Sequence, residues 1–257
     1  MIENNGFSTV DGVRAIELLY RPIKNVDDND TSFYQTELRL NGPQLGVLLP
    51  KDFIPVAELS EQCISIFKLA FVQLLQAINK FKSRDIDFSW ISVYMPVRFL
   101  RRDDCVKTVT DLCGKLDVMS KKICFEISDN LLLETDGSAA ENINVLRDKG
   151  FHFLLNSFGG DNCNMIKMAD FNVDFVMLSS SVIKTLGSNE RADSCVRSLI
   201  NFVNDLVAEP VAAEIFENSQ RSQLSEYQCL YYTGDSAGKY IAERYMRRRS
   251  NQNSDFN

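Results

Sequence analysis

Short apolar runs alternate with helical segments along most of the chain. Strands are predicted at residues 16–23 and 33–40, with turn-forming residues 27–30 between them. Between residues 55 and 81, apolar positions recur at spacings of three and four, which predicts one long amphipathic helix. Further apolar runs of strand length follow at residues 90–95, 123–127, 151–155, 175–178, 211–216 and 229–232.

About eight strands with helical segments between them, and no compositional break, predict a single (β/α)8 barrel of the TIM type. An open, doubly wound sheet is the alternative fold. We expect residues 1–15 to form an N-terminal arm, residues 16–249 the barrel, and residues 250–257 a flexible polar tail. In such a barrel, binding and chemistry take place at the carboxyl ends of the strands.

Composition narrows the class of protein. The 257 residues carry a net charge of −7, and the main cationic cluster is confined to residues 244–249, so a broad nucleic-acid-binding face is not expected. We find no leader pattern and no apolar run that would span a bilayer, and we expect a cytoplasmic protein without membrane contact. Seven scattered cysteines and a single histidine predict reduced, mostly buried thiols.

The carboxyl ends of the predicted strands carry mainly amides and hydroxyls, with few carboxylates. The polar residues at these ends are Gln35, Glu37, Arg39, Tyr94, Glu126, Asn156, Ser157, Ser179, Glu214, Glu217 and Thr233. They predict a mouth that is polar but poor in negative charge.

A series of segments, taken in order, resembles the EAL domain family of (β/α)8 barrels, which hydrolyse or bind the second messenger cyclic di-GMP. YRPI (20–23) is similar to the family's Y-Q-P-I, YQTELRL (34–40) to Y-E-A-L-L-R, and PKDFIPVAE (50–58) to P-x-x-F-I-P-x-A-E. FEISDNLLL (125–133) resembles the E-I-T-E segment, NSFGG (156–160) lies at D-D-F-G-T-G, DFVMLSSSVI (174–183) at D-x-x-K-I-D-x-S-F-V, and AEIFEN (213–218) at A-E-G-V-E-T. The order and spacing make the set more specific than any single segment.

The resemblance implies a site that this chain has largely lost. Active members of the family hold two divalent metals in a cage of carboxylates and one asparagine, and the metals activate the attacking water. The positions that resemble this site but are substituted are Gln35 (glutamate), Tyr94 (asparagine), Asn156 and Ser157 (paired aspartates), Met177 (lysine), Ser179 (aspartate) and Thr233 (glutamine). Glu126 is retained, with Glu214 and Glu217 more distant. Because Mg and Mn need dense anionic oxygen, we expect no metal, no cofactor and no catalysis.

Two alternatives concern the segment YQTELRL (34–40), which we call the first motif. In a shifted register Glu37 would supply the lost carboxylate, because residues 35, 37 and 39 share one face of a strand. This register moves Arg39 away from the family's arginine and leaves the missing aspartates unexplained. Alternatively, Glu37 and Arg39 pair with each other, which would occupy the guanidinium.

Some degenerate members of the family bind cyclic di-GMP through the arginine of the first motif, which is Arg39 here. The candidate ligand-binding residues are therefore Arg39, Glu126, Asp174, Glu214 and Glu217. An arginine presents a fork of donors that suits a phosphate.

The sequence therefore predicts a catalytically inactive, EAL-like regulatory protein that binds a partner protein in a cyclic di-GMP or motility-related pathway. A metal-independent cyclic di-GMP receptor is the second hypothesis, and residual phosphodiesterase activity is the third. The resemblance also suggests a homodimer formed through the segment after the fifth strand, although Gly160 and Asp161 replace the family's T-G there.

Overall fold

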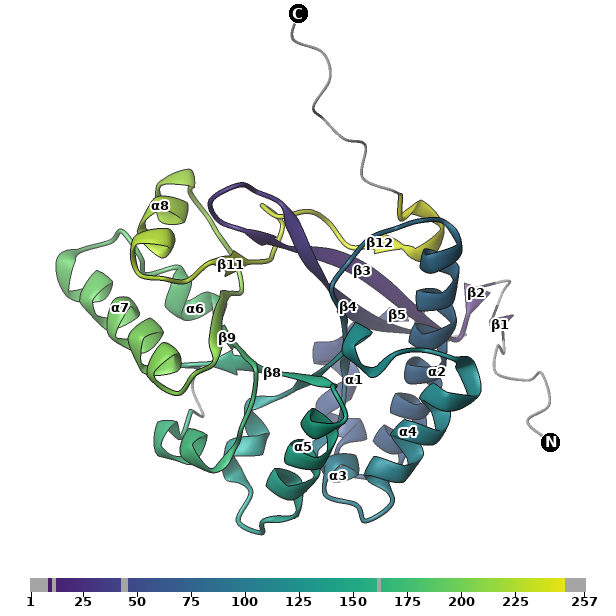
Figure 1. Cartoon of the computed structure of the whole chain (residues 1–257). Helices are drawn as coiled ribbons and strands as arrows, with labels where there is room; N and C mark the ends of the chain where they lie inside the picture. Colours follow the sequence, from purple (N-terminus) through teal and green to yellow (C-terminus); the bar gives the residue numbers. More distant parts are fainter. Residues whose placement is uncertain (1–8, 11–12, 43–45, 161–162, 248–257) are drawn as a thin grey trace, which may run out of the picture.

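The computed structural model describes residues 9–10, 13–42, 46–160 and 163–247. Eight strands form a closed barrel in the order β3-β11-β10-β9-β8-β7-β6-β4, and pairing of β4 with β3 closes the ring (Figure 1). The strands are β3 (Ile16–Asn25), β4 (Thr31–Gly42), β6 (Ile91–Tyr94), β7 (Ile123–Ile127), β8 (His152–Phe158), β9 (Phe175–Leu178), β10 (Glu209–Ala212) and β11 (Tyr231–Tyr232). The predicted barrel is thereby confirmed.

The barrel departs from a regular repeat of strand and helix at its first strand. β3 runs antiparallel to both of its barrel neighbours, β4 and β11, whereas the other barrel pairs are parallel. The reason is local: Asn25 N donates to Asp30 O at 2.8 Å, and Asn29 adopts a φ of 61°, so a tight turn replaces a crossover helix.

Short elements lie at the ends of the chain and of the sheet. β1 (Thr9–Val10) pairs with β2 (Val13–Arg14) within the predicted N-terminal arm. β5 (Gly46–Leu48) extends the sheet beside β4, and β12 (Ile241–Ala242) extends it beside β3. The predicted tail, residues 250–257, lies outside the described residues, as does Asp161.

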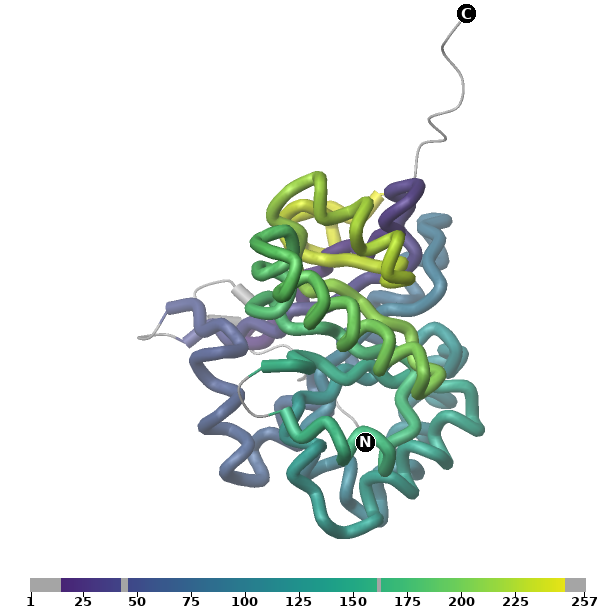
Figure 2. The backbone as a smooth tube through the Cα atoms, turned by 90° about the vertical axis from the view of Figure 1, so that its left-hand side faces the viewer, coloured from purple at the N-terminus to yellow at the C-terminus, as the bar shows by residue number. Residues whose placement is uncertain are grey.

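Helices cover the outside of the barrel. They are α1 (Pro50–Ala57), α2 (Gln62–Ser83), α3 (Val97–Leu100), α4 (Cys105–Leu116), α5 (Ser138–Asp148), α6 (Ser180–Ile183), α7 (Glu190–Asp205) and α8 (Asn218–Glu226). The 3-10 turns are η1 (Ser120–Lys122), η2 (Asp129–Leu133), η3 (Met165–Asp170) and η4 (Glu243–Tyr245). In Figure 2 the indigo segment that carries β5 and α1 stands at one edge of the barrel.

The prediction of one continuous helix over residues 55–81 is wrong at its start. Two helices occupy the region, and Leu59, which fits the apolar spacing, lies in the connection between them with 80% of its surface exposed. α1 contacts β4, while α2 packs on β3 and β6, so the chain changes direction between the two helices. The periodic spacing of apolar residues does not by itself reveal where a chain changes direction.

Within the described part of the chain, α2 alone is long and apolar enough to cross a membrane by length and composition. Its apolar face, however, is packed against the barrel. Phe67 and Phe71 stack on each other at 5.6 Å, and Phe71 lies 5.6 Å from Phe125 of β7. The helix therefore forms a large part of the core between the barrel and its outer layer.

A second core fills the barrel itself. It consists of Ile23, Phe33, Trp90, Cys124, Leu154, Phe175, Met177 and Val211. Phe33 stacks on Trp90 with ring centroids 4.2 Å apart, so the interior is closed by packed side chains. All seven cysteines are free thiols, and five of them are buried, as expected.

Candidate binding site at the mouth of the barrel

A cavity of about 510 Å³ opens at the carboxyl ends of the barrel strands. Among the predicted residues, the structure brings together Gln35, Glu37, Tyr94, Glu126, Asn156, Ser157, Met177, Ser179 and Glu214. Arg21, Lys51 and Tyr240 also line this cavity, although the sequence analysis did not single them out. Arg21 had a visible signal, because it replaces the glutamine of the family's Y-Q-P-I. Tyr240 had none, because it follows the last barrel strand and matches no motif.

Glu126 is the centre of the site and is 7% exposed. Its carboxylate accepts hydrogen bonds from Gln35 Nε2 at 3.0 and 3.1 Å, from Ser92 Oγ at 2.9 Å and from Asn156 Nδ2 at 2.6 Å. Burial raises the pKa of Glu126, while the three hydrogen-bonding side chains and the charge of Arg21 oppose that rise. Protein donors thus surround the carboxylate.

Arg21 fixes the orientation of the Gln35 amide. Its Nη2 donates to Gln35 Oε1 at 2.9 Å, and its guanidinium lies 4.4 Å from the centre of the Tyr240 ring. The Tyr240 hydroxyl donates to the same oxygen at 3.3 Å. Because a guanidinium has only donors, the amide oxygen faces Arg21 and the amide nitrogen faces Glu126. The amide thereby links a buried carboxylate to a protein cation.

The side chains at this site do not fit the two divalent metals that the family resemblance implies. Gln35 turns its nitrogen toward Glu126, and the Met177 sulfur lies 3.9 Å from that nitrogen, where it offers only a soft thioether. In the part of the chain that the structure describes, no three His, Cys, Asp or Glu side chains come close enough together to hold a metal ion. A hard cation would have to displace the hydrogen bonds around Glu126 and would meet one carboxylate at the centre.

Tyr94 forms one wall of the mouth. Its hydroxyl donates to the carboxylate of Glu58, the residue that ends α1, and Asn130 Nδ2 donates to the other carboxylate oxygen at 3.0 Å. Burial, followed by the hydrogen bond and charge of Glu58, raises the pKa of the Tyr94 phenol above its usual range. The phenol therefore stays protonated at neutral pH, and Glu58, the last residue of the FIPVAE segment, holds it in place.

An irregularity near the end of β8, between Leu155 and Phe158, aims Asn156 at Glu126. Ser157 adopts a φ of 63°, and its backbone N–H donates to Asn156 Oδ1 at 2.7 Å. With its oxygen held in this way, the Asn156 amide presents its nitrogen to the carboxylate. Ser157 itself is exposed at the rim of the cavity.

Arg39 pairs with Glu37 rather than pointing freely into the mouth. Arg39 Nε lies 2.7 Å from Glu37 Oε1, and the two side chains are 31% and 17% exposed. Of the two alternatives for this segment, the structure shows the one in which Glu37 and Arg39 pair with each other. The resemblance would assign the Arg39 guanidinium to a phosphate, but here it already contacts a carboxylate.

Besides Arg39, three of the predicted residues lie outside the cavity lining. Asp174 precedes β9 and so lies at the opposite end of the barrel, where it accepts hydrogen bonds from Arg147 Nη2 at 2.7 Å and Phe153 N at 2.8 Å. Glu217 caps the start of α8, and Thr233 is buried and donates to Pro22 O at 3.1 Å. Each of the three stabilises the barrel, so we do not include them in the candidate site.

Glu214 does line the mouth. Its carboxylate accepts a hydrogen bond from the backbone N–H of Asp235 at 2.9 Å. Gly234 makes this contact possible, because a Cβ atom at that position would lie 2.2 Å from the Glu214 carboxylate. Glu214 therefore contributes negative charge on the side of the mouth formed by the chain after β11.

Comparison with known proteins agrees with the barrel fold. The EAL domain model matches residues 13–240. The cyclic di-GMP phosphodiesterase PdeB of Shewanella oneidensis is 25% identical over 208 residues, which is 79% of this chain and 24% of that protein. The chain thus spans about a quarter of the length of that relative.

Solved structures show the same fold. The EAL enzyme Bd1971, in a form bound to cAMP and cyclic di-GMP, has a TM-score of 0.79 and 22% identity, over 90% of this chain and 64% of that chain. The EAL domain of FimX from Pseudomonas aeruginosa, bound to cyclic di-GMP, has a TM-score of 0.77 and 14% identity, over 89% and 91% of the two chains.

Proposed function

The chain belongs to the EAL domain family, and from this premise we propose that it is a catalytically inactive member that regulates another protein by binding it. The pathway would be one that uses cyclic di-GMP or controls motility, and the cytoplasm would be its location. One observation carries the proposal: Gln35, Ser92 and Asn156 donate hydrogen bonds to Glu126 where active members would hold their metals.

The loss of charge around this carboxylate supports inactivity. Two-metal hydrolysis needs oxygen ligands that hold both ions and lower the pKa of the attacking water. Here the Gln35 amide stands where the family has its first glutamate, and Met177 stands where it has a lysine. Neither side chain supplies the charge that the reaction needs.

Exposed apolar side chains support a protein-binding role. Ile166 and Met165 of η3 are 82% and 37% exposed, and Leu133 of the neighbouring η2 is 60% exposed. We call these three residues the η2–η3 patch. Apolar side chains grouped on a surface are typical of interaction sites. A second copy of the chain would be one such partner, so oligomeric state belongs in the test.

A metal-independent cyclic di-GMP receptor is the second candidate function. In its favour, the cavity of about 510 Å³ is of the size that holds small molecules, and Arg21 and Lys51 line it. Against it, Glu37 occupies Arg39, and the carboxylates of Glu126 and Glu214 in the cavity lining disfavour a dianion. Residual phosphodiesterase activity is the least supported candidate.

Titration calorimetry with cyclic di-GMP separates these candidates when it is run with Mg, with Mn and with chelator, beside an assay for phosphodiester hydrolysis. We expect neither turnover nor heat. Binding in chelator that is lost in Arg39→Ala would establish the receptor instead, and metal-dependent turnover would refute inactivity.

The protein-binding role has its own test. The full chain is cross-linked in its source cell, and its partner and its oligomeric state are recorded. Ile166→Glu should abolish the cross-linked species, because it places a charge in the η2–η3 patch. Val207→Glu makes the same kind of change at a residue that is 92% exposed elsewhere, and it should leave the species intact. Equal effects of the two variants would count against the patch.

A further inference from the structure

The chain after the last barrel strand returns across β3 instead of forming an outer helix. We call residues 234–247 the C-terminal strap. Within it, β12 pairs antiparallel with β3, with Ile241 opposite Tyr20 and Ala242 opposite Leu19. Gly238 has a φ of +154°, and a Cβ atom there would lie 2.9 Å from Pro22, so the strap can follow β3 closely.

One part of the strap lies in the mouth of the barrel. Tyr240 lines the cavity, its ring covers Arg21 at 4.4 Å, and its hydroxyl donates to Gln35 at 3.3 Å. It thus contacts Gln35, which donates to Glu126, and Arg21, which orients the Gln35 amide. Tyr240 is the only strap residue in the lining of this cavity.

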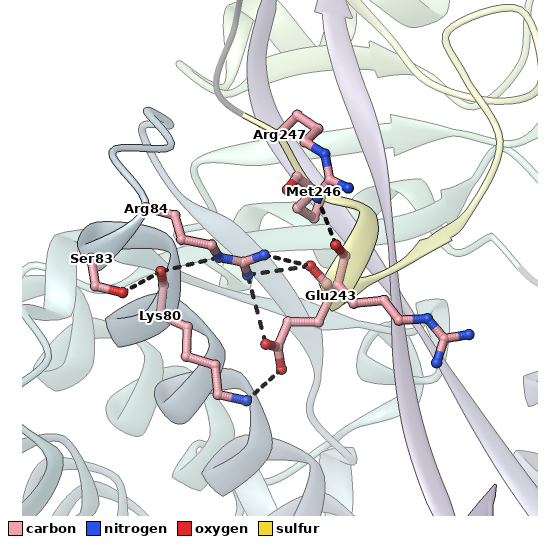
Figure 3. Close-up of polar contacts among 7 residues, drawn as sticks. Lys80, Ser83, Arg84, Glu243, Met246 and Arg247 are labelled. Atoms are coloured by element: carbon pink, nitrogen blue, oxygen red, sulfur yellow. Dashed lines mark hydrogen bonds and ion pairs between the residues drawn. The ribbon is translucent and has the colours of Figure 1, made fainter.

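Three residues farther on, the strap is fastened to the outside of the molecule. The Glu243 carboxylate lies 3.0 Å from Lys80 Nζ and 3.6 Å from Arg84 Nη2, both at the end of α2 (Figure 3). Arg84 also donates through Nη1 and Nη2 to the Glu243 carbonyl oxygen at 3.3 and 3.2 Å. Met246 follows and is buried, at 2% exposure.

We propose that the C-terminal strap is a latch that couples the end of α2 to the mouth. While Lys80 and Arg84 hold Glu243, the short β12 pairing keeps Tyr240 over Arg21 and Gln35. Release of Glu243 frees Tyr240 and opens that side of the cavity. This inference goes beyond the proposed function, because it concerns access to the mouth whatever the mouth binds.

The charges around the latch indicate what would release it. Lys80 is 50% exposed and Arg84 is 34% exposed, and Arg244 and Arg247 lie exposed in and after the same turn. Lys80 and Arg84 contact the single carboxylate of Glu243, and Arg244 and Arg247 add positive charge to the same stretch of chain in a protein whose net charge is −7. An acidic segment of a partner protein would therefore compete with Glu243 for Lys80 and Arg84.

The test uses the full chain labelled with 3-fluorotyrosine, with the Tyr240 resonance assigned by its loss in Tyr240→Phe. Glu243→Lys places a cation against Lys80 and Arg84. We expect the Tyr240 resonance to move toward that of Tyr245, which is 54% exposed, and to titrate in the ordinary range of a solvent-exposed 3-fluorotyrosine, which lies below that of tyrosine because fluorine makes the phenol more acidic. In the native chain, burial raises the pKa of Tyr240 above that range. Amide exchange in residues 234–247 should also become at least about tenfold faster.

Asp170→Lys is the matched control. It makes the same change of charge in another surface ion pair, between Lys167 and Asp170 at 2.9 Å, and it should leave the Tyr240 resonance unchanged. Adding Lys80→Glu to Glu243→Lys should restore the native resonance, because it re-forms the closest pair with exchanged signs.

Two results would overturn the inference. If Glu243→Lys leaves the Tyr240 resonance in place, or if the control moves it equally, the latch does not control the mouth. A third arm adds poly-glutamate to the native chain, with poly-lysine as its control. Poly-glutamate should reproduce the effect of Glu243→Lys, and no response would refute release by an acidic partner. Calorimetry with cyclic di-GMP plays no part in these arms, so they fail independently of the proposed function.

Discussion

Gln35→Glu restores the family's first glutamate and tests whether the mouth is built to exclude metals. In the native chain, Gln35 Nε2 donates to both oxygens of Glu126, at 3.0 and 3.1 Å. The substitution replaces this donor with a second carboxylate oxygen at the same place. Two buried carboxylates at that separation cannot both ionise, so the pair should retain one proton at neutral pH.

Gln35→Glu should lower the free energy of unfolding through two effects. A hydrogen bond to a charged group contributes about 1.5–3 kcal/mol, and it is lost. Each unit by which the pKa of the pair rises above its unfolded value costs about 1.4 kcal/mol at higher pH. With allowance for overlap between the two effects, we expect the free energy of unfolding to fall by about 3–5 kcal/mol at pH 7.5.

The pH dependence has a definite sign. The folded carboxyl pair has a raised pKa, so the folded state binds more protons than the unfolded state above about pH 4.3. The free energy of unfolding therefore falls as pH rises from the ordinary glutamate pKa to the raised one. The variant should lose less stability at pH 5.5 than at pH 7.5.

Urea unfolding at both pH values, with Mg, with Mn and with chelator, measures these effects. Gln62→Glu, the same change at an exposed residue, should shift stability by no more than about 0.5 kcal/mol. We expect no rescue by either metal, because Asn156, Tyr94 and Met177 still supply no further carboxylate. Rescue by Mg or Mn, or a cost below about 0.5 kcal/mol, would refute our account of the site.

Three further predictions concern residues that shape the barrel. Gly234→Ala should lower the melting temperature measured by calorimetry, because the new Cβ would meet Glu214 and the φ of +104° disfavours an L side chain; an unchanged transition would contradict this close approach. Met177→Ala, at a site 2% exposed in the barrel core, should cost about 2–5 kcal/mol in denaturant unfolding, and a cost below 1 would mean that the core refills. Arg147→Met leaves Asp174 without its cation, 2.7 Å away in the native chain, and should lower the melting temperature; Arg101→Met, which breaks a more exposed pair, should lower it less, and equal shifts would contradict a stabilising role of the Arg147 pair.

Much of the fold could be predicted from local patterns. Each predicted strand overlaps a barrel strand, because a strand buried on both faces is a short apolar run wherever it lies. The prediction of one helix across α1 and α2 was wrong, because Leu59 satisfies the helical spacing although the chain turns there. The antiparallel direction of β3 has a local cause in the turn at residues 27–30. We predicted that turn, but the expectation of a regular (β/α)8 barrel did not take the resulting direction of β3 into account.

The candidate site, like the fold, could be predicted in part from the sequence. Which residue stands at a motif position is a matter of residue identity, so Gln35 and Asn156 could be predicted from the sequence as positions that differ from the motifs of the family. Asp174 was assigned to the ligand because its motif is retained, but its place before β9 puts it at the far end of the barrel. The strand predicted at residues 175–178 begins after Asp174, so the strand prediction already placed this residue at the amino end, against the assignment by motif.

The sequence by itself determined the barrel, the family and which of the positions that resemble the family's metal site carry uncharged groups, because these depend on residue type and order along the chain. Only the tertiary structure decided what fills the space left by those groups. Arg21, Gln35 and Glu126 come from three strands, and Tyr240 reaches them from the C-terminal strap. Hydrogen bonds among side chains so distant in sequence depend on directions and distances that exist only after the barrel has closed.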